Sequence, residues 1–343
     1  MRKNYLLIIT IVLLAGSCKK EIKDIAMDVQ PSESVFSTGC SGNTWSAAYE
    51  FNGYIGAPIL VYNNKAYVFN YNPANPGLGE ISIYDGTTWT TKLSTTPFGQ
   101  YWPDYTFVIG NKGYFGYSFD QNLLEEYNFD ANTWADKTGF TGPARRGEAT
   151  FSIGSKGYIV GGANYNNNTN YYVTWEYNQV TNSWAQKASF PFPAFGRTGA
   201  AGFTIGNKGY IVNGKSDLAP PNYDYYYNTL LQYDQAANTW AIKASFPGNA
   251  RSYTKTFVLG GLAYAGGGFH PSNDSFRDFY KYNPSNDTWT SIPDIPVVGN
   301  IIGNFSLNGK GYVIYEYYNN THDLELEKYT PQTCTVTPQR TDQ

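Results

Sequence analysis

A unit of about 50 residues recurs six times along the chain, and this repeat constrains the fold more than any other feature. Each unit has an anchor tyrosine after a tight turn such as Asn-Lys-Gly; the anchors are Tyr67, Tyr114, Tyr158, Tyr210, Tyr264 and Tyr312. An apolar residue precedes each anchor by seven positions; these residues are Leu60, Phe107, Phe151, Phe203, Phe257 and Phe305. A second tyrosine closes a later strand in every unit; these are Tyr84, Tyr127, Tyr177, Tyr233, Tyr282 and Tyr329. Aromatic and β-branched runs interrupted by Gly and Asn predict strands, so we expect an all-β fold of six four-stranded units.

The tryptophans indicate how the ends of the chain are used. Five units carry a tryptophan soon after the closing tyrosine; these are Trp89, Trp134, Trp184, Trp240 and Trp289. The sixth unit has none after Tyr329, whereas Trp45 stands alone before the first unit. We therefore predict that the N-terminal strand around Trp45 completes the last unit and closes a ring, which would leave no free sheet edge.

These units resemble kelch repeats, most clearly in the third, where the turn is followed by Tyr158-Ile159-Val160-Gly161-Gly162. The resemblance extends from about residue 42 to residue 338, although only the third and fifth units keep the diglycine. It implies a six-bladed β-propeller similar to the central domain of galactose oxidase. Aromatic residues at a fixed register in every blade are then expected to pack between the blades.

The N-terminal residues are predicted to lie outside the propeller. Arg2 and Lys3 precede an apolar run that is too short to span a bilayer as a mature helix. The sequence Leu14-Ala15-Gly16-Ser17-Cys18 resembles a bacterial lipoprotein signal, which implies cleavage after residue 17 and lipid on Cys18. The alternative is an ordinary secretory signal in which the cysteine is coincidental. Residues 18–39 are polar and are predicted to form a flexible tether, so we expect a protein anchored in the cell envelope, on either side of an outer membrane.

The two remaining cysteines lie near the two ends of the predicted propeller, residues 40–338, which a tail of residues 339–343 follows. Cys40 lies five residues before Trp45, and Cys334 lies five residues after Tyr329. In an oxidising compartment we expect these two cysteines to form a disulfide, the alternative being two unpaired thiols.

Composition argues against several classes of function. Net charge is −3 and only 15% of residues are charged, which gives no indication of nucleic-acid binding. The only histidines are His270 and His322, and no Cys/His spacing suggests a metal site. The copper centre of the related galactose oxidase needs a Tyr–Cys crosslink, for which no cysteine is available. We therefore expect no metal and no cofactor.

Candidate ligand-binding residues come from the face that carries the long loops, where strand one of each unit begins. Loops of variable length on a rigid scaffold commonly carry function. Thirteen residues before the anchors, consecutive units have Tyr54, Tyr101, Arg145, Arg197 and Arg251. Trp102 follows one of these positions, and loops of the fourth and fifth units contribute Tyr225 and His270. Arginine binds carboxylates in a fork, so this arc suits an anionic ligand with flat apolar faces. The alternative is that the arginines donate to backbone carbonyls of the next blade.

Three functions remain open from the sequence. The first is a non-catalytic module that binds a glycan or peptide and is a monomer. The second is an enzyme, because some six-bladed kelch proteins are sugar mutarotases and Glu148 follows Arg145 closely enough for acid–base work. The third is a scaffold for another envelope protein.

Overall fold

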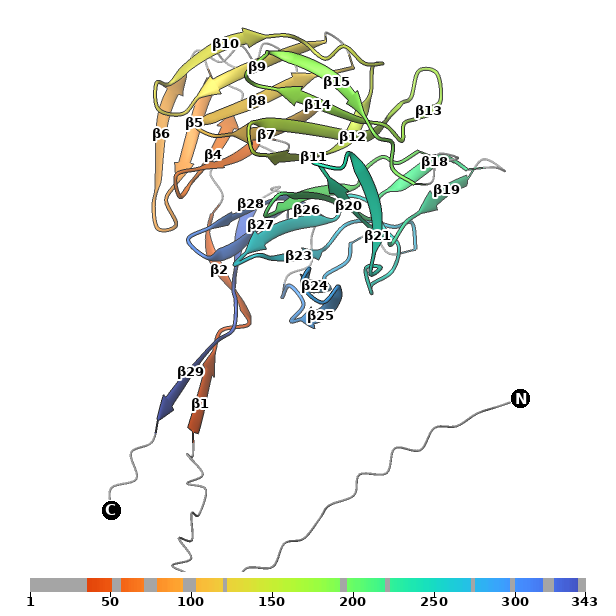
Figure 1. The fold of residues 1–343 in the computed structure, drawn as a ribbon. Helices are drawn as coiled ribbons and strands as arrows, with labels where there is room; N and C mark the ends of the chain where they lie inside the picture. The colour runs from red at the N-terminus through yellow and green to blue at the C-terminus, as the bar shows by residue number, and fades with distance from the viewer. Residues whose placement is uncertain are drawn as a thin grey trace, which may run out of the picture. The chain divides into compact units, whose positions relative to one another are not determined.

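The structure, a computed structural model, describes residues 36–50, 57–70, 79–94, 103–119, 122–191, 196–219, 223–272, 275–296, 300–316 and 324–338. The secondary structure of this part is entirely β (Figure 1). Nothing in these ranges forms a helix long and apolar enough to cross a membrane. The chain separates into a compact unit, Cys40–Cys334, and a second unit made of Met1–Gly39 with Thr335–Gln343.

The compact unit contains six four-stranded antiparallel blades, which form a ring. Blade 1 comprises β3 (Ile59–Tyr62), β4 (Lys65–Asn70), β5 (Gly79–Tyr84) and β6 (Trp89–Ser94). Blade 2 comprises β7 (Tyr105–Ile109), β8 (Lys112–Tyr117), β9 (Leu123–Asn128) and β10 (Thr133–Lys137). Blade 3 comprises β11 (Arg146–Ile153), β12 (Lys156–Asn164), β14 (Thr174–Asn178) and β15 (Ser183–Lys187).

The remaining blades follow in chain order. Blade 4 comprises β16 (Ala201–Ile205), β17 (Lys208–Val212), β20 (Leu230–Asp234) and β21 (Thr239–Lys243). Blade 5 comprises β22 (Lys255–Leu259), β23 (Leu262–Gly266), β24 (Phe279–Asn283) and β25 (Thr288–Ile292). Blade 6 comprises β26 (Asn300–Leu307), β27 (Lys310–Glu316), β28 (Leu324–Thr330) and β2 (Thr44–Glu50).

Five further strands lie outside the blade order. β13 (Thr169–Asn170) pairs with the end of β12, and β18 (Lys215–Ala219) pairs with β19 (Tyr223–Tyr226). β1 (Phe36–Ser41) pairs with β29 (Thr333–Pro338).

The innermost strands of the six blades contact one another in sequence around the ring. β3 contacts β7, β7 contacts β11, and the series continues through β16, β22 and β26 back to β3. Connections from the outermost strand to the next innermost strand therefore open on one face, together with the loops between the second and third strands. We call this the long-loop face.

The sixth blade contains a strand from the N-terminal side of the first blade. β2 pairs antiparallel with β28, and Trp45 lies opposite Tyr329. The indole of Trp45 packs against Tyr329, with ring centroids 5.2 Å apart. Trp45 therefore occupies the register position that Trp184, Trp240 and Trp289 occupy in blades 3 to 5, each opposite its closing tyrosine.

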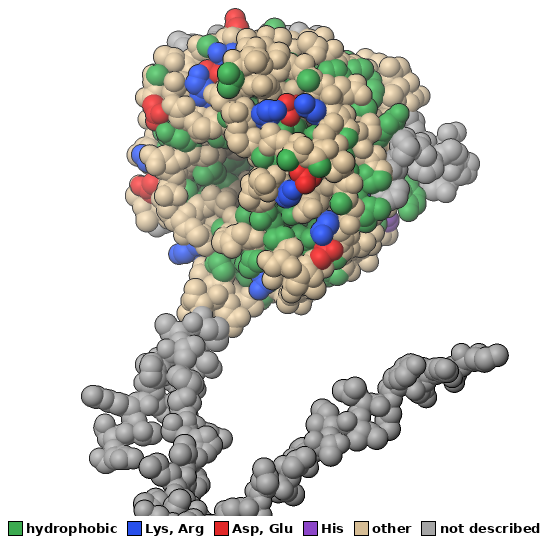
Figure 2. Space-filling model, viewed as in Figure 1, with side chains coloured by type: hydrophobic (Ala, Val, Ile, Leu, Met, Phe, Trp, Pro, Cys, Tyr) green, Lys and Arg blue, Asp and Glu red, His purple; other side chains and the backbone are tan. Residues whose placement is uncertain are grey.

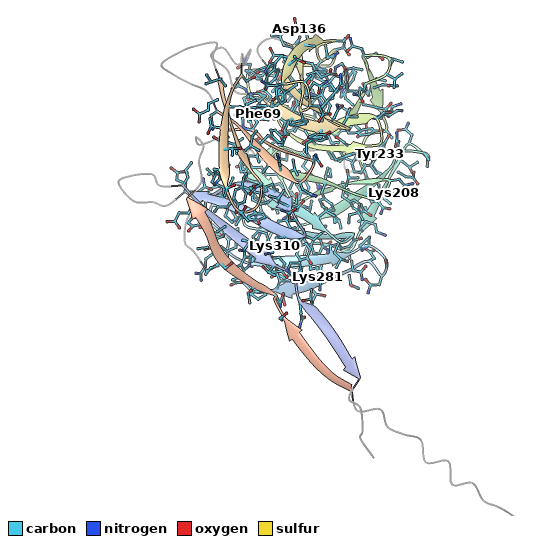
Figure 3. All side chains as sticks on the ribbon, turned by 90° about the vertical axis from the view of Figure 1, so that its left-hand side faces the viewer. Phe69, Asp136, Lys208, Tyr233, Lys281 and Lys310 are labelled. Carbon is cyan, nitrogen blue, oxygen red and sulfur yellow. The ribbon has the colours of Figure 1, made fainter. Side chains whose placement is uncertain are left out.

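The two repeated tyrosines meet across the boundaries between blades. Tyr114 of blade 2 packs on Tyr177 of blade 3 with centroids 5.3 Å apart, and Tyr158 of blade 3 packs on Tyr233 of blade 4 at 5.4 Å. The last and first blades meet in the same way, through Tyr312 and Tyr84, at 5.8 Å. These rings are almost completely buried, so the aromatic repeat supplies the core between blades, as its register predicts. Figure 3 labels Phe69 and Tyr233 within these side-chain layers.

The diglycine of blade 3 lies inside a strand. Gly161 and Gly162 are part of β12, which continues to Asn164. Both glycines have positive φ, and the amide of Gly162 donates to the carbonyl of Arg197 in the next blade. A Cβ on Gly162 would lie 2.9 Å from Glu148 Cγ, so only glycine fits this bend.

Candidate functional site

The three arginines lie inside the packing of blades 3 to 5. Each is fully buried, and each guanidinium lies close to two aromatic rings, one from the connection that precedes its blade and one from the connection between that blade's second and third strands. The flanking rings are Phe140 and Tyr171 for Arg145, Phe190 and Tyr227 for Arg197, and Phe246 and Phe276 for Arg251. The centroids nearest to the guanidinium carbon are 4.1, 4.2 and 3.6 Å away, respectively, a geometry that stabilises a buried cation.

The hydrogen bonds of the arginines repeat in the same way. Arg145 donates to the carbonyl of Gly161, Arg197 to that of Asn213, and Arg251 to that of Gly267, at 2.9, 3.2 and 3.2 Å. Each acceptor lies sixteen residues further along the chain, in the same blade as the arginine. The prediction that the arginines would donate to carbonyls of the next blade is therefore wrong. These contacts nevertheless fit a structural role for the arginines.

Burial also limits what the arginines offer to a ligand. Loss of hydration lowers the pKa of Arg145 and of Arg197 to about 10. Arg251 additionally forms a fork with the carboxylate of Asp278, with 2.9 Å between Nη2 and Oδ2. Because no guanidinium reaches the surface, the arc of arginines does not present exposed donors for an anionic ligand.

Glu148 lies beside Arg145 at the boundary between blades 2 and 3. Its Oε1 accepts a hydrogen bond of 2.7 Å from Ser118, and burial raises its pKa to about 7 against the opposing effects of Ser118 and Arg145. Oε2 of Glu148, Nη2 of Arg145 and the hydroxyl of Tyr105 are buried without a hydrogen-bond partner in the described structure. A carboxyl group with a pKa near 7 can give up or take up a proton at neutral pH.

Exposed aromatic side chains occur on one face only within the described ranges. Tyr165, Tyr172 and Tyr225 lie in the connections between the second and third strands of blades 3 and 4, Tyr225 within β19. Tyr253 lies just before the innermost strand of blade 5, and Phe269 lies just after that blade's second strand. All five positions therefore belong to the long-loop face of three consecutive blades. Large exposed aromatic groups in one area commonly mark a binding surface.

Two of these tyrosines lie near two charged residues across blades 3 to 5, and we call these four residues the aromatic patch: Tyr165, Tyr253, Lys215 and Asp217. Burial raises the pKa of the Tyr165 hydroxyl, which interacts with the side chain of Thr198 and lies near the side chains of Asp217, Lys215 and Tyr253. Thr198 exchanges two backbone hydrogen bonds of 2.8 Å with Lys215.

Ion pairs and ring contacts connect the aromatic patch with the residues beside it. Lys215 forms ion pairs with Asp217 and with Asp224, the latter at 3.0 Å. These charges lie close together with opposite signs, and Figure 2 shows that some of the sparse charged side chains on the face it draws are also next to one of opposite sign. His270 packs edge-on against Tyr226 with centroids 4.4 Å apart, and its Nδ1 bonds to Ser272. Tyr225 packs against Tyr227, the ring that covers Arg197.

Several candidate residues fall beyond the described structure. Tyr54, Tyr101, Trp102, His322 and Cys18 lie outside the described residues, and so do the side chains of Cys40 and Cys334. Among the residues that are described, no group of three His, Cys, Asp or Glu side chains is placed to hold a metal ion.

The sequence analysis did not identify Tyr253 or Lys215 as members of this surface. A signal existed for Tyr253, because the position two residues after the repeated arginine is Gly147 in the third unit and Gly199 in the fourth. An aromatic residue at a register position otherwise occupied by glycine indicates a special environment.

Comparisons with known proteins agree with this architecture. A family model described as Kelch motif matches residues 250–296. The F-box/kelch-repeat protein SKIP30 of Arabidopsis thaliana is 30% identical over 125 residues, 35% of this chain and 35% of that protein. An N-acetylneuraminate epimerase of Haemophilus influenzae is 30% identical over 113 residues, 32% of this chain and 28% of that protein. The matches thus span about a third of these relatives' lengths.

A solved structure shows the same fold over most of the chain. The structure of YjhT aligns with a TM-score of 0.54 and 13% sequence identity, covering 69% of this chain and 83% of that one.

Proposed function

The chain is a kelch-repeat β-propeller, and from this premise we propose that it is a non-catalytic binding module that captures a glycan or peptide on its long-loop face. One observation carries the proposal. The exposed aromatic side chains in the described ranges all lie on that face, in three consecutive blades. A rigid ring that presents aromatic rings next to hydrogen-bonding groups suits recognition by shape and stacking.

The location of such a module is part of the same proposal. A lipid on Cys18 would hold the propeller at a membrane of the cell envelope through the tether of residues 19–39. Envelope location would expose the long-loop face to glycans and to other envelope proteins. A monomer is sufficient for this role, because the proposed surface is formed by one chain.

The proposed function is tested by binding and turnover measured together. The full chain is applied to a glycan array and to a displayed peptide library, and sugar anomerisation is followed by NMR. Binding without turnover supports the module. Absence of binding to both glycans and peptides contradicts it. Capture of one envelope protein, with sugars and peptides ignored, supports a scaffold instead.

A second candidate function is a sugar mutarotase or epimerase that uses Glu148 with Arg145. The observation in its favour is the raised pKa of Glu148, about 7, next to two unpartnered polar groups. Partial relatives named N-acetylneuraminate epimerase add support over about a third of the chain. The complete burial of Arg145 argues against direct contact with a substrate. Turnover that is abolished by Glu148→Gln would favour this function over the binding module.

A further inference from the structure

The backbone of Tyr253 adopts a conformation that aromatic residues rarely occupy. Its φ is 56°, in the left-handed region. Every other non-glycine residue with positive φ in the described ranges is Asn or Asp, the residues that tolerate this region best. Tyr253 therefore occupies a strained conformation that the surrounding structure maintains.

The strain arises from the register of the repeat. Gly147 and Gly199 occupy the equivalent positions in blades 3 and 4, with φ of 73° and 62°. The three residues are joined across the blades, because the amide of Gly199 donates to the carbonyl of Gly147 at 2.9 Å and the amide of Tyr253 to that of Gly199 at 2.7 Å. The position thus requires a left-handed residue, and glycine satisfies it without strain in two blades out of three.

The ring of Tyr253 is only half buried, so its packing does little to offset the backbone strain. It is 49% exposed, and it lies against Gly199, where an added Cβ would meet the ring at 3.3 Å. A strained residue whose side chain is half in solvent is poorly explained by stability. Local strain that is retained at an exposed position commonly serves binding.

The groups around Tyr253 restrict the chemistry of a ligand. Tyr165, which is 48% exposed, has a hydroxyl that can donate or accept a hydrogen bond. In the ion pair beside it, the ammonium of Lys215 can donate and the carboxylate of Asp217 can accept. Arg197 and Arg251 are buried and Lys215 is paired with Asp217 and Asp224, so these described groups offer no excess positive charge to an anion.

An extended peptide would also find few backbone partners at this place. Thr198 and Lys215 already exchange their backbone hydrogen bonds, and Ser252 and Phe269 do the same. Strand addition needs unpaired backbone groups, which these residues do not offer. Sugar rings combine a face of C–H groups, which stacks on aromatic rings, with hydroxyls that donate and accept.

We propose that Tyr253 is a stacking platform for a neutral sugar ring, whose hydroxyls bind to Tyr165, Lys215 and Asp217. This inference rests on the proposed function and specifies its ligand class. Tyr253→Gly removes the ring and inserts the residue that blades 3 and 4 use, so the fold is expected to be kept. Tyr253→Phe keeps the stacking face. Val180→Gly, in the turn between β14 and β15 on the opposite face, is the matched loss of an exposed apolar side chain.

The full-length variants are compared on an array of neutral and acidic glycans, and the best neutral oligosaccharide is titrated by calorimetry. We expect wild type to bind neutral glycans and Tyr253→Gly to bind about tenfold more weakly or worse. Tyr253→Phe and Val180→Gly should bind within about threefold of wild type. The melting temperature of Tyr253→Gly should equal or exceed that of wild type.

Each contrary outcome identifies what failed. Unchanged affinity of Tyr253→Gly, or a clear fall in its melting temperature, overturns the role of Tyr253. Binding only to acidic glycans, or to library peptides and not to glycans, overturns the neutral-sugar assignment but leaves a binding module. Absence of binding to glycans and peptides alike overturns the proposed function and this inference with it.

Discussion

Asn182 of blade 3 accepts a hydrogen bond of 2.9 Å from the backbone amide of Thr138 in blade 2. The same side-chain oxygen accepts the hydroxyl of Tyr177 at 2.8 Å, and the indole of Trp184 donates to the carbonyl of Thr138 at 2.9 Å. We call this pair of hydrogen bonds to one side-chain oxygen the clasp. Asn238 in blade 4 and Asp287 in blade 5 accept the equivalent pair. In each of blades 3, 4 and 5, one side-chain oxygen therefore connects a buried tyrosine to the neighbouring blade.

Removing the oxygen of Asn182 should destabilise the protein. Asn182→Gly preserves the positive φ but leaves the hydroxyl of Tyr177 and the amide of Thr138 without this acceptor. We expect a loss of about 1–3 kcal/mol in the free energy of unfolding, measured by urea denaturation. Asn168→Gly is the control, because Asn168 has a similar φ in an exposed loop and forms no clasp. Equal effects of the two substitutions would mean that the clasp contributes nothing.

The buried arginines should matter for stability and not for ligand affinity. Arg197→Met removes bonds to Asn213 and Thr229 and the stacking on Tyr227, so we expect a loss of about 2–4 kcal/mol in unfolding free energy. Arg146→Met, which removes a half-exposed guanidinium paired with Asp104, should cost less than about 1 kcal/mol. Folded Arg197→Met should bind the ligand as wild type does. A variant of normal stability that has lost affinity would restore the ligand role of the arginine.

Glu148 should make stability fall as the pH rises. Its folded pKa of about 7 lies above its ordinary value of 4.5, so between these pH values the folded protein holds a proton that the unfolded chain has released. The free energy of unfolding should therefore decrease from pH 4.5 to pH 7, by up to about 3 kcal/mol, and stay low above pH 7.

Glu148→Gln should remove this dependence. Glu125, whose pKa burial also raises to about 7, acts in the same direction, so the difference between wild type and variant isolates Glu148. Urea denaturation at pH 5 and pH 8 measures it. Parallel stability curves for both proteins would show that the proton on Glu148 is not coupled to folding.

The disulfide between Cys40 and Cys334 stays a prediction, with a geometric reason in its favour. In the pairing of β2 with β28, Thr44 lies opposite Thr330 and Trp45 opposite Tyr329. The hydroxyls of Ser41 and Thr333 are 3.4 Å apart, so the same register continues and would place Cys40 opposite Cys334. We expect Cα atoms about 4.4–6.8 Å apart and a lower melting temperature after both are replaced by Ser. Identical melting of oxidised and reduced protein would contradict the bond.

The lipid anchor on Cys18 is tested by fractionation. Cys18→Ala should move the protein from the membrane fraction to the soluble fraction, because the proposed anchor depends on this one side chain. Cys334→Ser is the control for loss of a cysteine. An unchanged membrane fraction for Cys18→Ala would contradict the lipoprotein hypothesis.

The repeat made the number and content of the blades predictable, because anchors such as Tyr158 and Tyr210 recur with the period of the fold. The same period fixed the register of Arg145, Arg197 and Arg251 but not the direction of their side chains. A register position near the mouth fits both a solvent-facing group and a buried one. What decides between them is the pair of aromatic rings around each arginine, and those rings come from loops of variable length.

The aromatic patch was harder to predict for a related reason. Tyr253 and Tyr165 come from different blades, and they meet only because the ring brings the loops of blades 3 and 5 to the same face. No spacing in the sequence encodes that proximity. The positive φ of Tyr253 is likewise set by the backbone hydrogen bond to Gly199, a contact between blades.

The place of β2 in the sixth blade has a consequence for biosynthesis. β2 is made before any other blade strand, yet its partner β28 is made last of all blade strands. During synthesis on a ribosome, or during passage through a membrane, Trp45 cannot pair with Tyr329 until nearly the whole chain has emerged. Pairings of such high sequence separation form slowly. The sixth blade should thus assemble late, and a chain truncated before β28 should leave β2 open to proteases and chaperones.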